Sequence, residues 1–440
     1  MKRYVLVGTG MRGTLSYMVP MVRDLSDCVE LTAVYDINPK RAQAAVAHVK
    51  KVVEDLKTPG GDADKIKIYT DFDEMLSVEK PDAVMITSKD CTHDYYAIKA
   101  MEAGCDVVSE KPLTTDEVKF NAIYDCMQRT GRKLIVTFNC RFDPFYVKIK
   151  ELLTAGTIGE VLSVHYEWLL DTDHGASYFR RWHRERKNSG SLLIHKATHH
   201  FDLLNWFLDQ EPVKVNAFGT QRYYGPNREN RSERCLTCPH KSTCEYYYDI
   251  DKSDFDKTFY HDCEDEDGYL RDGCVFSDDI DIEDSVSVNI RYSKGTVASY
   301  SLTTHSPYEG PKIVFNGEEG RIEADSYYSI EEGKQIREIR IYTRYSDVIR
   351  YGFDARGMKA RTNSQIGAVV SKDAYGGHNG SDDLIRSMIF RGGKCDPLGQ
   401  IADIKAAAMS IGIGIAANKS MKEDRAVYVK ELYDYLKKDE

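Results

Sequence analysis

Four side chains in two short segments carry the groups that proton transfer at a hydroxyl requires. Lys111 lies in Glu110-Lys111-Pro112, and His195, Lys196 and His199 lie close together further along. A neutral imidazole accepts a proton near neutral pH, and an ammonium group stabilises a developing alkoxide. We expect His199 to accept the proton, Lys111 and Lys196 to hold substrate oxygens, and His195 to be a further acid–base group. The alternatives are helix packing for the histidines and a solvated surface position for Lys111.

The segment 190–206 has helical spacing, with apolar side chains available for packing. Because His195 and His199 are four residues apart, the spacing predicts that they share one face of this helix. Asp202, three residues beyond His199, could then orient its imidazole. The same spacing fits a pair of metal ligands, although no acidic third ligand is close in sequence.

A basic, aromatic segment, Arg180-Arg181-Trp182-His183-Arg184-x-Arg186, precedes this helix. Its side chains could stack on a ring and bind hydroxyls or an anionic substrate. A solvated basic loop is the alternative. His378 and Asp382, in a glycine-rich segment further along, are additional candidates for the same pocket.

A dinucleotide fingerprint opens the chain. Residues 4–7 are an uncharged run typical of a buried strand, Gly8, Gly10 and Gly13 follow at G-x-G-x-x-G spacing, and 14–25 has helical spacing. Gly8 allows a tight turn, Gly10 lets the backbone approach a pyrophosphate, and Gly13 lets the helix pack on the strand. The helix N-terminus offers free N–H groups to the phosphates. A glycine turn without a nucleotide is the alternative.

The second predicted strand, 31–35, ends in Asp36, at about the spacing where the fingerprint places its acidic residue. A carboxylate there accepts hydrogen bonds from a ribose diol and repels a 2′-phosphate. We therefore predict NAD as the cofactor in preference to NADP, although Arg41 could weaken that preference.

Up to residue 138, predicted strands alternate with predicted helices. Strands at 4–7, 31–35, 67–69, 83–87, 106–109 and 133–138 indicate a doubly wound parallel sheet, a Rossmann domain over residues 1–138. Its ligand crevice lies beyond the carboxyl ends of the strands. The predicted cofactor-binding residues are Gly8, Gly10, Met11, Arg12, Gly13, Asp36, Arg41, Thr87, His93, Glu110 and Lys111.

After residue 138 the pattern changes to strands in succession. A helix at 146–155 is followed by period-2 segments at 161–169, 213–218, 285–292, 296–303, 312–315, 321–324 and 337–342, and helices return at 382–391 and 397–420. This order predicts an α/β domain over 139–440 with a large, open, mainly antiparallel sheet. The other face of that sheet could form the interface of a homodimer or homotetramer.

Residues 219–280 form a polar, tyrosine-rich insertion with a cysteine cluster. A Cys-x-x-Cys pair with a third cysteine six residues later favours zinc or an iron–sulfur cluster over a disulfide in a cytoplasmic chain. A metal would stabilise a segment that cannot bury much of a core. A reduced cysteine cluster and a redox role are the alternatives. The predicted ligands are Cys235, Cys238, Cys244 and Cys274, with Cys263, His240 and His261 as alternatives to the last.

Charge and hydropathy limit the classes of partner. Lys and Arg total 60 against 70 Asp and Glu, a net charge of −10, which argues against nucleic acid or an anionic membrane as the main partner. The sequence has no apolar run of membrane-spanning length, and its first residues enter a strand without the apolar region of a signal peptide. We therefore expect a cytoplasmic protein whose cysteines are thiols or metal ligands.

Several motifs lie along the chain. They are the glycine fingerprint, Glu110-Lys111-Pro112, Asn139-x-Arg141-Phe142-x-Pro144, Gly156-x-Ile158-Gly159, Gly377-His378-x-Gly380-Ser381-Asp382 and Ala416-Ala417-x-x-Ser420. Together they resemble the glucose–fructose oxidoreductase / inositol dehydrogenase / MocA (Gfo/Idh/MocA) family, and the resemblance covers nearly the whole chain. It implies an NAD(P)-binding Rossmann domain, an α/β substrate domain, hydride transfer on sugars, cyclitols or related polyols, and an oligomer.

The resemblance also implies roles for single residues. It places Lys111 near the nicotinamide and the substrate. The family usually carries Asp-x-x-x-His followed by x-x-Asp, which His199 and Asp202 fit, but His195 stands here in place of the aspartate, and with Lys196 it makes the site more positive. The predicted substrate-binding residues are Arg141, Arg181, Trp182, His183, Lys196, Asp202 and His378.

The leading interpretation is an NAD-dependent oxidoreductase that acts on CH–OH groups of a sugar, cyclitol or sugar derivative. One alternative keeps the cofactor but oxidises the sugar only transiently, so that a glycosidic or C–O bond eliminates before the hydride returns. The His195–Lys196 pair would supply the extra acid–base group that elimination needs. A second alternative is a non-catalytic regulator that binds NAD and a sugar, and the presence of Lys111 and His199 argues against it.

Overall fold

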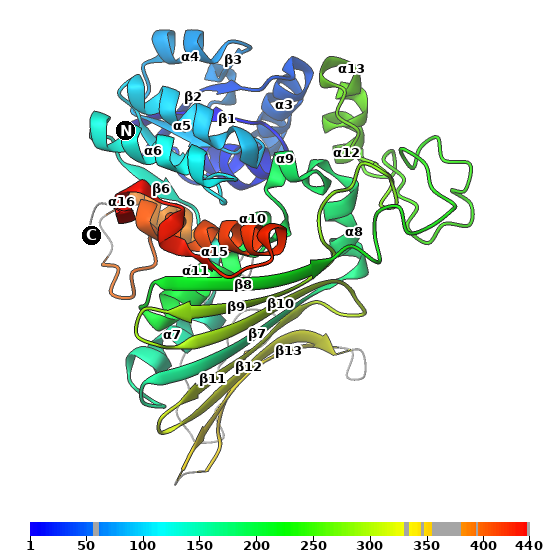
Figure 1. Ribbon diagram of the computed structural model, residues 1–440. Coiled ribbons are helices and arrows are strands. Elements are labelled where there is room, and N and C mark those ends of the chain that lie inside the picture. Colours follow the sequence, from blue (N-terminus) through cyan, green and yellow to red (C-terminus); the bar gives the residue numbers. More distant parts are fainter. Residues whose placement is uncertain (56–60, 330–333, 345–346, 354–379, 393–394, 438–440) are drawn as a thin grey trace.

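Two β-sheets, one parallel and one mainly antiparallel, form the framework of the computed structural model (Figure 1). The structure describes residues 1–55, 61–329, 334–344, 347–353, 380–392 and 395–437. The N-terminal sheet, the C-terminal sheet and the helices between them surround one large cavity.

The N-terminal sheet has six parallel strands in the order β3-β2-β1-β4-β5-β6, which confirms the predicted Rossmann arrangement. Alternate residues of β1 enter two different apolar clusters, Val5 and Val7 on one face and Tyr4 and Leu6 on the other. Both faces are therefore covered, as expected for an uncharged strand in a doubly wound sheet. The strands are β1 (Lys2–Val7), β2 (Val29–Tyr35), β3 (Lys67–Tyr69), β4 (Ala83–Ile86), β5 (Asp106–Ser109) and β6 (Leu134–Val136).

Helices connect these strands on both sides of the sheet. They are α1 (Met11–Gly13), continued by a π-helical turn at Thr14–Met18 and by α2 (Val19–Arg23), then α3 (Pro39–Asp55), α4 (Phe72–Glu79), α5 (His93–Glu102) and α6 (Glu117–Thr130). The turn into α1 depends on two glycines. Gly8 has φ +89°, and a Cβ on Gly13 would lie 2.1 Å from the Gly8 carbonyl oxygen. Only glycine permits both the turn and this close packing.

The C-terminal sheet has nine strands in the order β14-β13-β12-β11-β7-β10-β9-β8-β15. The β7–β10 pair is parallel and the remaining pairs are antiparallel, which confirms the predicted mainly antiparallel sheet. The strands are β7 (Val161–Asp171), β8 (Pro212–Thr220), β9 (Ser285–Tyr292), β10 (Val297–Ser306), β11 (Gly310–Gly317), β12 (Gly320–Ser329), β13 (Lys334–Thr343), β14 (Ile349–Gly352) and β15 (Val427–Tyr428).

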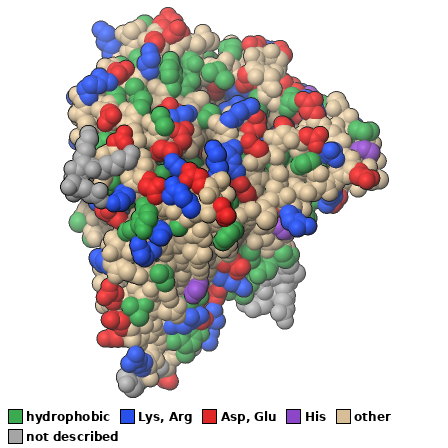
Figure 2. Space-filling view, in the orientation of Figure 1, with side chains coloured by type: hydrophobic (Ala, Val, Ile, Leu, Met, Phe, Trp, Pro, Cys, Tyr) green, Lys and Arg blue, Asp and Glu red, His purple; other side chains and the backbone are tan. Residues whose placement is uncertain are grey.

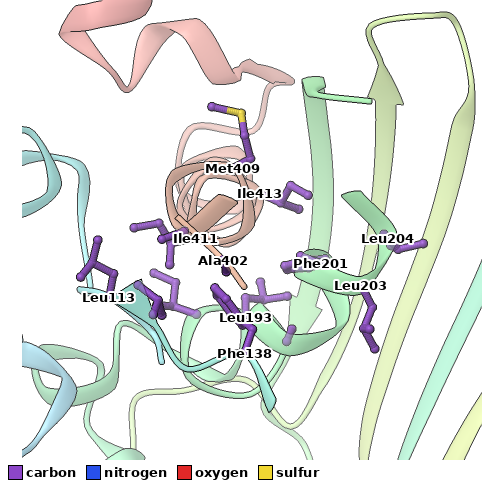
Figure 3. Packing of buried hydrophobic residues seen from close by; sticks show 14 of the residues in the cluster. Leu113, Phe138, Leu193, Phe201, Leu203, Leu204, Ala402, Met409, Ile411 and Ile413 are labelled. Carbon is purple, nitrogen blue, oxygen red and sulfur yellow. The ribbon is translucent and has the colours of Figure 1, made fainter. Parts of the chain in front are cut away.

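One face of this sheet is covered by helices, and the long helix α15 (Ile404–Glu423) connects it to the Rossmann domain (Figure 1). α15 contacts β8 on the sheet and α6 and β6 on the other side. Figure 3 shows Leu113 of the N-terminal domain and Leu193 and Phe201 of the C-terminal domain gathered around α15. The other helices are α7 (Pro144–Thr154), α8 (Thr172–Arg180), α9 (Arg186–Ser189), α10 (Leu192–His195), α11 (Thr198–Leu208), α12 (Asp254–Phe259), α13 (Glu264–Asp267), α14 (Ser381–Arg386) and α16 (Asp434–Lys437).

The opposite face of the sheet is open to solvent. Along β9, Ser287, Asn289 and Arg291 are exposed while the residues between them are buried. Phe218 on β8 and Val297 on β10 are large apolar side chains that are also exposed. On the visible face in Figure 2, basic and acidic side chains are interspersed over the Rossmann domain. In the described ranges, the structure has no helix long and apolar enough to span a membrane.

The insertion between β8 and β9, residues 221–284, packs against the Rossmann domain, with α12 and α13 beside α3 (Figure 1). Asn38 Nδ2 donates to the carbonyl of Cys263 at 2.9 Å, and the His48 ring meets the Phe259 ring edge-on at 6.1 Å. The insertion therefore buries its apolar side chains against α3 as well as internally.

The predicted metal centre in this insertion is not supported. All eleven cysteines are free, and the described part of the chain brings no three His, Cys, Asp or Glu side chains together as a metal-ligand set. This applies to Cys235, Cys238, Cys244 and Cys274 and to the pair His195 and His199. An ion-pair network holds the insertion instead: Arg234 lies 2.7 Å from both Glu264 and Asp272. Packing against α3 and this ion-pair network are the contacts that hold the insertion in the described structure.

Candidate active site

A cavity of about 1060 Å³ lies between the two sheets, beyond the carboxyl ends of β1, β2, β4 and β5. Gly8, Gly10 and Asp36 line one end of it, and Lys111 and His195 line the other. The cavity thus joins the glycine-rich turn to the residues expected to do chemistry. Further predicted residues on its wall are Met11, Arg12, Arg41, Thr87, His93, Glu110, Arg181, Trp182, His183, Lys196 and His199.

Asp36 is held rigidly at the end of β2. It accepts hydrogen bonds from the Thr9 backbone N–H at 2.7 Å, from Thr9 Oγ1 at 2.9 Å and from the Asn38 backbone N–H at 2.9 Å. Thr87 Oγ1 donates to the Gly8 carbonyl at 2.6 Å and fixes the neighbouring turn. These contacts preorganise the wall where the fingerprint places a ribose and a pyrophosphate.

Arg41 is surrounded by acceptors. Its Nη2 lies 2.8 Å from Asp267 of the insertion, its Nη1 lies 3.4 Å from Asp36, and its Nε donates to the Phe259 carbonyl at 3.1 Å. Two carboxylates therefore neutralise this buried guanidinium. Asp267 is 226 residues away in sequence, so the sequence alone gave no sign of this pairing.

The insertion also supplies cavity residues that sequence reasoning missed. The Met11 backbone N–H donates to Tyr260 Oη at 3.1 Å, and Tyr260, Tyr269 and Arg271 line the cavity. The Arg271 guanidinium lies 4.1 Å from the Tyr260 ring centre and 3.0 Å from Asp256. The only sequence signal was the high tyrosine content of the insertion.

Arg12, Glu110 and Asp382 form a buried ionic cluster at the floor of the site. Arg12 donates to Glu110 at 2.7 Å and makes two 3.0 Å bonds to Asp382 of α14. Tyr17 Oη donates to Glu110 at 2.7 Å. This cluster attaches α14 to the glycine-rich turn. His93 has a similar positioning role, since its ring nitrogens lie 2.8 and 3.1 Å from the Pro112 and Ser88 carbonyls.

Lys111 reaches across from the Rossmann domain to the helices of the second domain. Its Nζ donates to the backbone carbonyl of His195 at 3.0 Å. Burial lowers the pKa of Lys111, while the nearby carboxylates of Asp90 and Glu110 act in the opposite direction. The ammonium group of Lys111 therefore lies next to the segment of the second domain that contains His195 and His199.

The predicted single helix over 190–206 is two helices, α10 and α11, which separate at Lys196 and Ala197. His195 ends α10 and His199 lies in the first turn of α11, so the expected shared helix face is wrong. The chain has no proline or glycine at this break, which is why the sequence did not reveal it. The two imidazoles consequently meet different neighbours.

His195 is paired with a carboxylate from the Rossmann domain. Its Nδ1 lies 2.6 Å from Asp90 Oδ2, and both side chains are buried. Burial raises the pKa of Asp90 and lowers the pKa of His195, and the charges of Lys111 and His183 lower the latter further. When the shared proton is on Nδ1, Nε2 is left to accept a proton, which is the geometry of an oriented general base.

Lys196 and His199 complete this end of the cavity. The Lys196 ammonium lies 4.8 Å from the Trp168 ring centre, and the neighbouring Tyr178 and Glu309 raise its pKa although burial opposes its charge. The His199 ring meets the Phe138 ring edge-on at 6.1 Å. Both side chains remain candidates for contact with a substrate because both line the cavity.

Two predicted substrate-binding residues lie away from the cavity wall. Arg141 and Asp202 form a buried, two-bond ion pair at 2.8 and 2.6 Å, and Arg141 also donates to the Gly399 carbonyl. Asp202 therefore binds Arg141 rather than orienting His199. His378 lies outside the described residues.

Comparisons with known proteins agree with this architecture. Residues 2–138 match the family model of an oxidoreductase family with an NAD-binding Rossmann fold, Gfo/Idh/MocA, and residues 150–430 match the model of its C-terminal α/β domain. The Bacillus subtilis (strain 168) protein YteT, which is named as an oxidoreductase, is 34% identical over 458 residues that cover 98% of this chain and 99% of YteT.

Other relatives are more distant. Inositol 2-dehydrogenase 2 of Saccharopolyspora erythraea is 28% identical over 221 residues, covering 49% of this chain and 57% of that protein. A levoglucosan dehydrogenase solved with NADH and L-sorbose superposes with a TM-score of 0.64 at 18% identity, covering 98% of this chain and 100% of that one. An NAD-binding oxidoreductase of Klebsiella pneumoniae gives a TM-score of 0.64 at 16% identity, and the match covers 97% of this chain and 98% of that one. At these identities the two structures are informative about the fold alone.

Proposed function

The chain belongs to the Gfo/Idh/MocA oxidoreductase family, and we propose that it is an NAD-dependent dehydrogenase acting on a sugar, cyclitol or sugar derivative. The observation that carries this proposal is the single cavity that runs from Gly10 and Asp36 to Lys111 and His195. A cofactor along the first part would present its reactive ring to a substrate held in the second.

The residues at the N-terminal end fit a dinucleotide. Gly8 and Gly10 line the cavity without side chains, the close packing at Gly13 fixes the turn, and the rigid Asp36 carboxylate offers acceptors to a ribose. The Met11 N–H, at the start of α1, donates to Tyr260 Oη, so this contact holds the insertion against the glycine-rich turn where we place the pyrophosphate. The nicotinamide of bound NAD supplies the hydride acceptor for alcohol oxidation.

The charges around Asp36 favour NAD over NADP. A 2′-phosphate needs an unpaired cation, and the nearest arginine, Arg41, is already neutralised by Asp36 and Asp267. Binding NADP would place the phosphate next to two carboxylates or require Arg41 to leave both. Like-charge contact of this kind disfavours NADP strongly.

The residues at the substrate end of the cavity have different roles in proton transfer and in substrate binding. In the forward direction we assign proton acceptance to His195, oriented by Asp90, and stabilisation of the substrate alkoxide to Lys111. Lys196 holds a second substrate oxygen. His199, which the sequence alone suggested as the base, becomes the second acid–base group of the cavity, since it lines the cavity and its ring packs edge-on against Phe138.

The presence of two acid–base groups in the cavity, His195 and His199, supports a second candidate function. In this cycle a base takes the hydroxyl proton as the hydride leaves. The carbon next to the new carbonyl then loses a proton to a base while an acid protonates the leaving oxygen, and water adds to the resulting double bond before the hydride returns. His195 and His199 could fill these roles. The regulator hypothesis is less well supported because a binding-only protein has no need of the buried Asp90–His195 pair.

We also propose that the open face of the C-terminal sheet forms an oligomer interface. Phe218 and Val297 are exposed on it among polar residues. Light scattering after gel filtration should give a dimer or tetramer, and Phe218→Glu with Val297→Glu should shift the mass toward the monomer.

The dehydrogenase proposal is tested by mixing the purified protein and NAD with a panel of sugars, cyclitols and glycosides. NADH absorbance should rise while the sugar loses two hydrogens, as followed by mass spectrometry. A glycoside consumed with no net NADH would favour the elimination cycle. Tight NAD binding without any turnover across the panel would favour the regulator.

A further inference from the structure

Several cations at the catalytic end of the cavity lack a carboxylate partner. Among the described residues, no Asp or Glu oxygen lies within 4.0 Å of the side-chain nitrogens of Lys111, Lys196 or Arg181. In contrast, Arg12 and Arg41, which line the cofactor end, each contact two carboxylates. The excess positive charge is thus concentrated where a substrate would bind.

Arg181 is the one of these three to which the proposed function assigns no contact with the substrate. Its Nε donates to the Ser177 carbonyl at 3.0 Å, which leaves both terminal nitrogens of the guanidinium for a ligand. The guanidinium lies 5.8 Å from the Tyr178 ring centre, and that ring lies 5.5 Å from the His195 ring. Arg181 is therefore separated from the Asp90–His195 pair by a single aromatic side chain.

The neighbours of Arg181 also have the features of a ligand-binding site. His183 is 4% exposed and its Nδ1 has no hydrogen-bond partner among the described residues, although it lines the cavity. Trp182 stacks on His183 at 3.7 Å. Burial and the like charge of Arg271 lower the pKa of Arg181. Two cations close together, an orphaned imidazole and a stacked indole are the features of a site for an anion attached to a ring.

We propose that the substrate is a sugar acid, whose carboxylate binds the terminal nitrogens of Arg181 while its reacting hydroxyl faces Lys111 and His195. A planar guanidinium matches a carboxylate with two parallel hydrogen bonds, which a lysine cannot do. Lys196 is then available for a further hydroxyl. This inference rests on the proposed dehydrogenase function and adds the substrate class to it.

The pyrophosphate of the cofactor is a second source of negative charge. Arg271 lies over Tyr260, and the Tyr260 hydroxyl contacts the Met11 N–H at the glycine-rich turn. If Arg181 served the pyrophosphate together with Arg271, its replacement would weaken NADH binding. Replacing Arg181 should therefore weaken sugar-acid binding if the anion is the substrate carboxylate, and NADH binding if it is the pyrophosphate. Binding of the cofactor and of the sugar must be measured separately.

The test uses the full-length protein and its Arg181→Gln variant. Calorimetry gives the Kd of NADH and, on the NADH complex, the Kd values of a hexuronic acid and of the neutral hexose with the same stereochemistry. Reaction rates are measured with NAD on the same two sugars. Lys187→Gln, which removes an exposed cation from the same segment, is the matched control.

We expect the unmodified protein to bind the acid more tightly than the neutral sugar, and Arg181→Gln to weaken acid binding by at least about 30-fold with NADH binding and neutral-sugar binding unchanged. Lys187→Gln should behave like the unmodified protein.

Equal binding of both sugars, or binding of neither, would overturn the inference. So would an Arg181→Gln defect confined to NADH, which would assign the anion site to the pyrophosphate. Turnover of neutral sugars alone would refute the sugar-acid inference and leave the dehydrogenase standing, whereas failure to bind NADH would refute the proposed function itself.

Discussion

Asp90 Oδ2 lies 2.6 Å from His195 Nδ1, and this contact joins the Rossmann domain to the second domain at the centre of the cavity. The resemblance to the family predicts an aspartate at the position of His195. In this chain the carboxylate comes from a different domain and the imidazole occupies the position on α10. The site thus contains a buried carboxylate and two histidines, His195 and His199.

Removing this pair should impair catalysis much more than cofactor binding. We predict that His195→Asn lowers kcat by about 10²- to 10⁴-fold, because the oriented base is lost. Asp90→Leu should lower kcat by a smaller factor, since His195 remains but is no longer held in one tautomer. The measurement is steady-state kinetics, with NADH affinity as the folding control.

His199→Asn is the matched comparison. If His199 is the second acid–base group, its loss should reduce kcat less than the loss of His195. The opposite order of the two variants would return the role of proton acceptor to His199, as the sequence alone suggested.

The pH dependence of kcat should follow the charges around His195. Asp90, Lys111, Lys196, His183, Arg181 and Tyr178 face or surround it. Burial and the positive neighbours lower its pKa, so the imidazole stays neutral and competent as a base until the pH falls below its ordinary range. Arg181→Gln removes one positive charge, raises the pKa of His195 and should move the acid limb of the kcat profile to higher pH. An acid limb that stays in place would contradict this account.

Asp267 should control the choice of cofactor through Arg41. In Asp267→Asn the guanidinium keeps the Phe259 carbonyl and only the longer of its two carboxylate contacts, to Asp36, so its Nη2 is available to a 2′-phosphate. We predict that the ratio of the Kd of NADP to the Kd of NAD falls by about tenfold or more, as measured by fluorescence titration. Asp265→Asn, which removes an exposed carboxylate from the same helix, is the control and should leave the ratio unchanged.

The Arg141–Asp202 pair should matter for stability. Asp202→Ala leaves a buried, uncompensated guanidinium, so we predict a loss of about 3–5 kcal/mol in the free energy of unfolding. Glu151→Ala, which breaks the exposed pair with Lys148, should cost no more than about 1 kcal/mol. Denaturant unfolding of both variants distinguishes the two. A stable Asp202→Ala protein with a raised KM would mean that Asp202 binds substrate after all.

The insertion should be insensitive to metal removal. A chelator in excess should leave Tm unchanged, because ion pairs and packing on α3 hold residues 221–284 together. Arg234→Ala should lower Tm, since it leaves the buried Asp272 without its partner. Stoichiometric zinc or iron in the purified protein, with a fall in Tm on chelation, would restore the predicted cysteine centre.

The elements that the sequence predicted well are those with strong local patterns. The strand, glycine turn and helix at residues 4–25 follow from the types and spacing of a few residues, and alternating burial along β9 is visible as period-2 hydrophobicity. Both sheets could be assigned on this basis. The Glu110-Lys111-Pro112 motif likewise placed Lys111 at the cavity through its position after β5.

The features that were missed depend on contacts between distant segments. Asp90 and His195 are 105 residues apart, and Arg41 and Asp267 are 226 apart, so no spacing rule could pair them. The break between α10 and α11 has no glycine or proline to signal it. The cysteine spacing suggested a metal, whereas the structure shows Arg234 paired with Glu264 and Asp272, partners that the sequence did not indicate.

The most direct test of the central claim compares NADH formation by the unmodified protein and by Lys111→Met on the best sugar of the panel. We predict that the unmodified protein forms one NADH for each sugar oxidised, and that Lys111→Met binds NAD with similar affinity but reacts at least about 10²-fold more slowly. The account would be contradicted if the protein bound NAD but formed no NADH with any sugar of the panel. It would also be contradicted if the Lys111→Met variant reacted as fast as the unmodified protein.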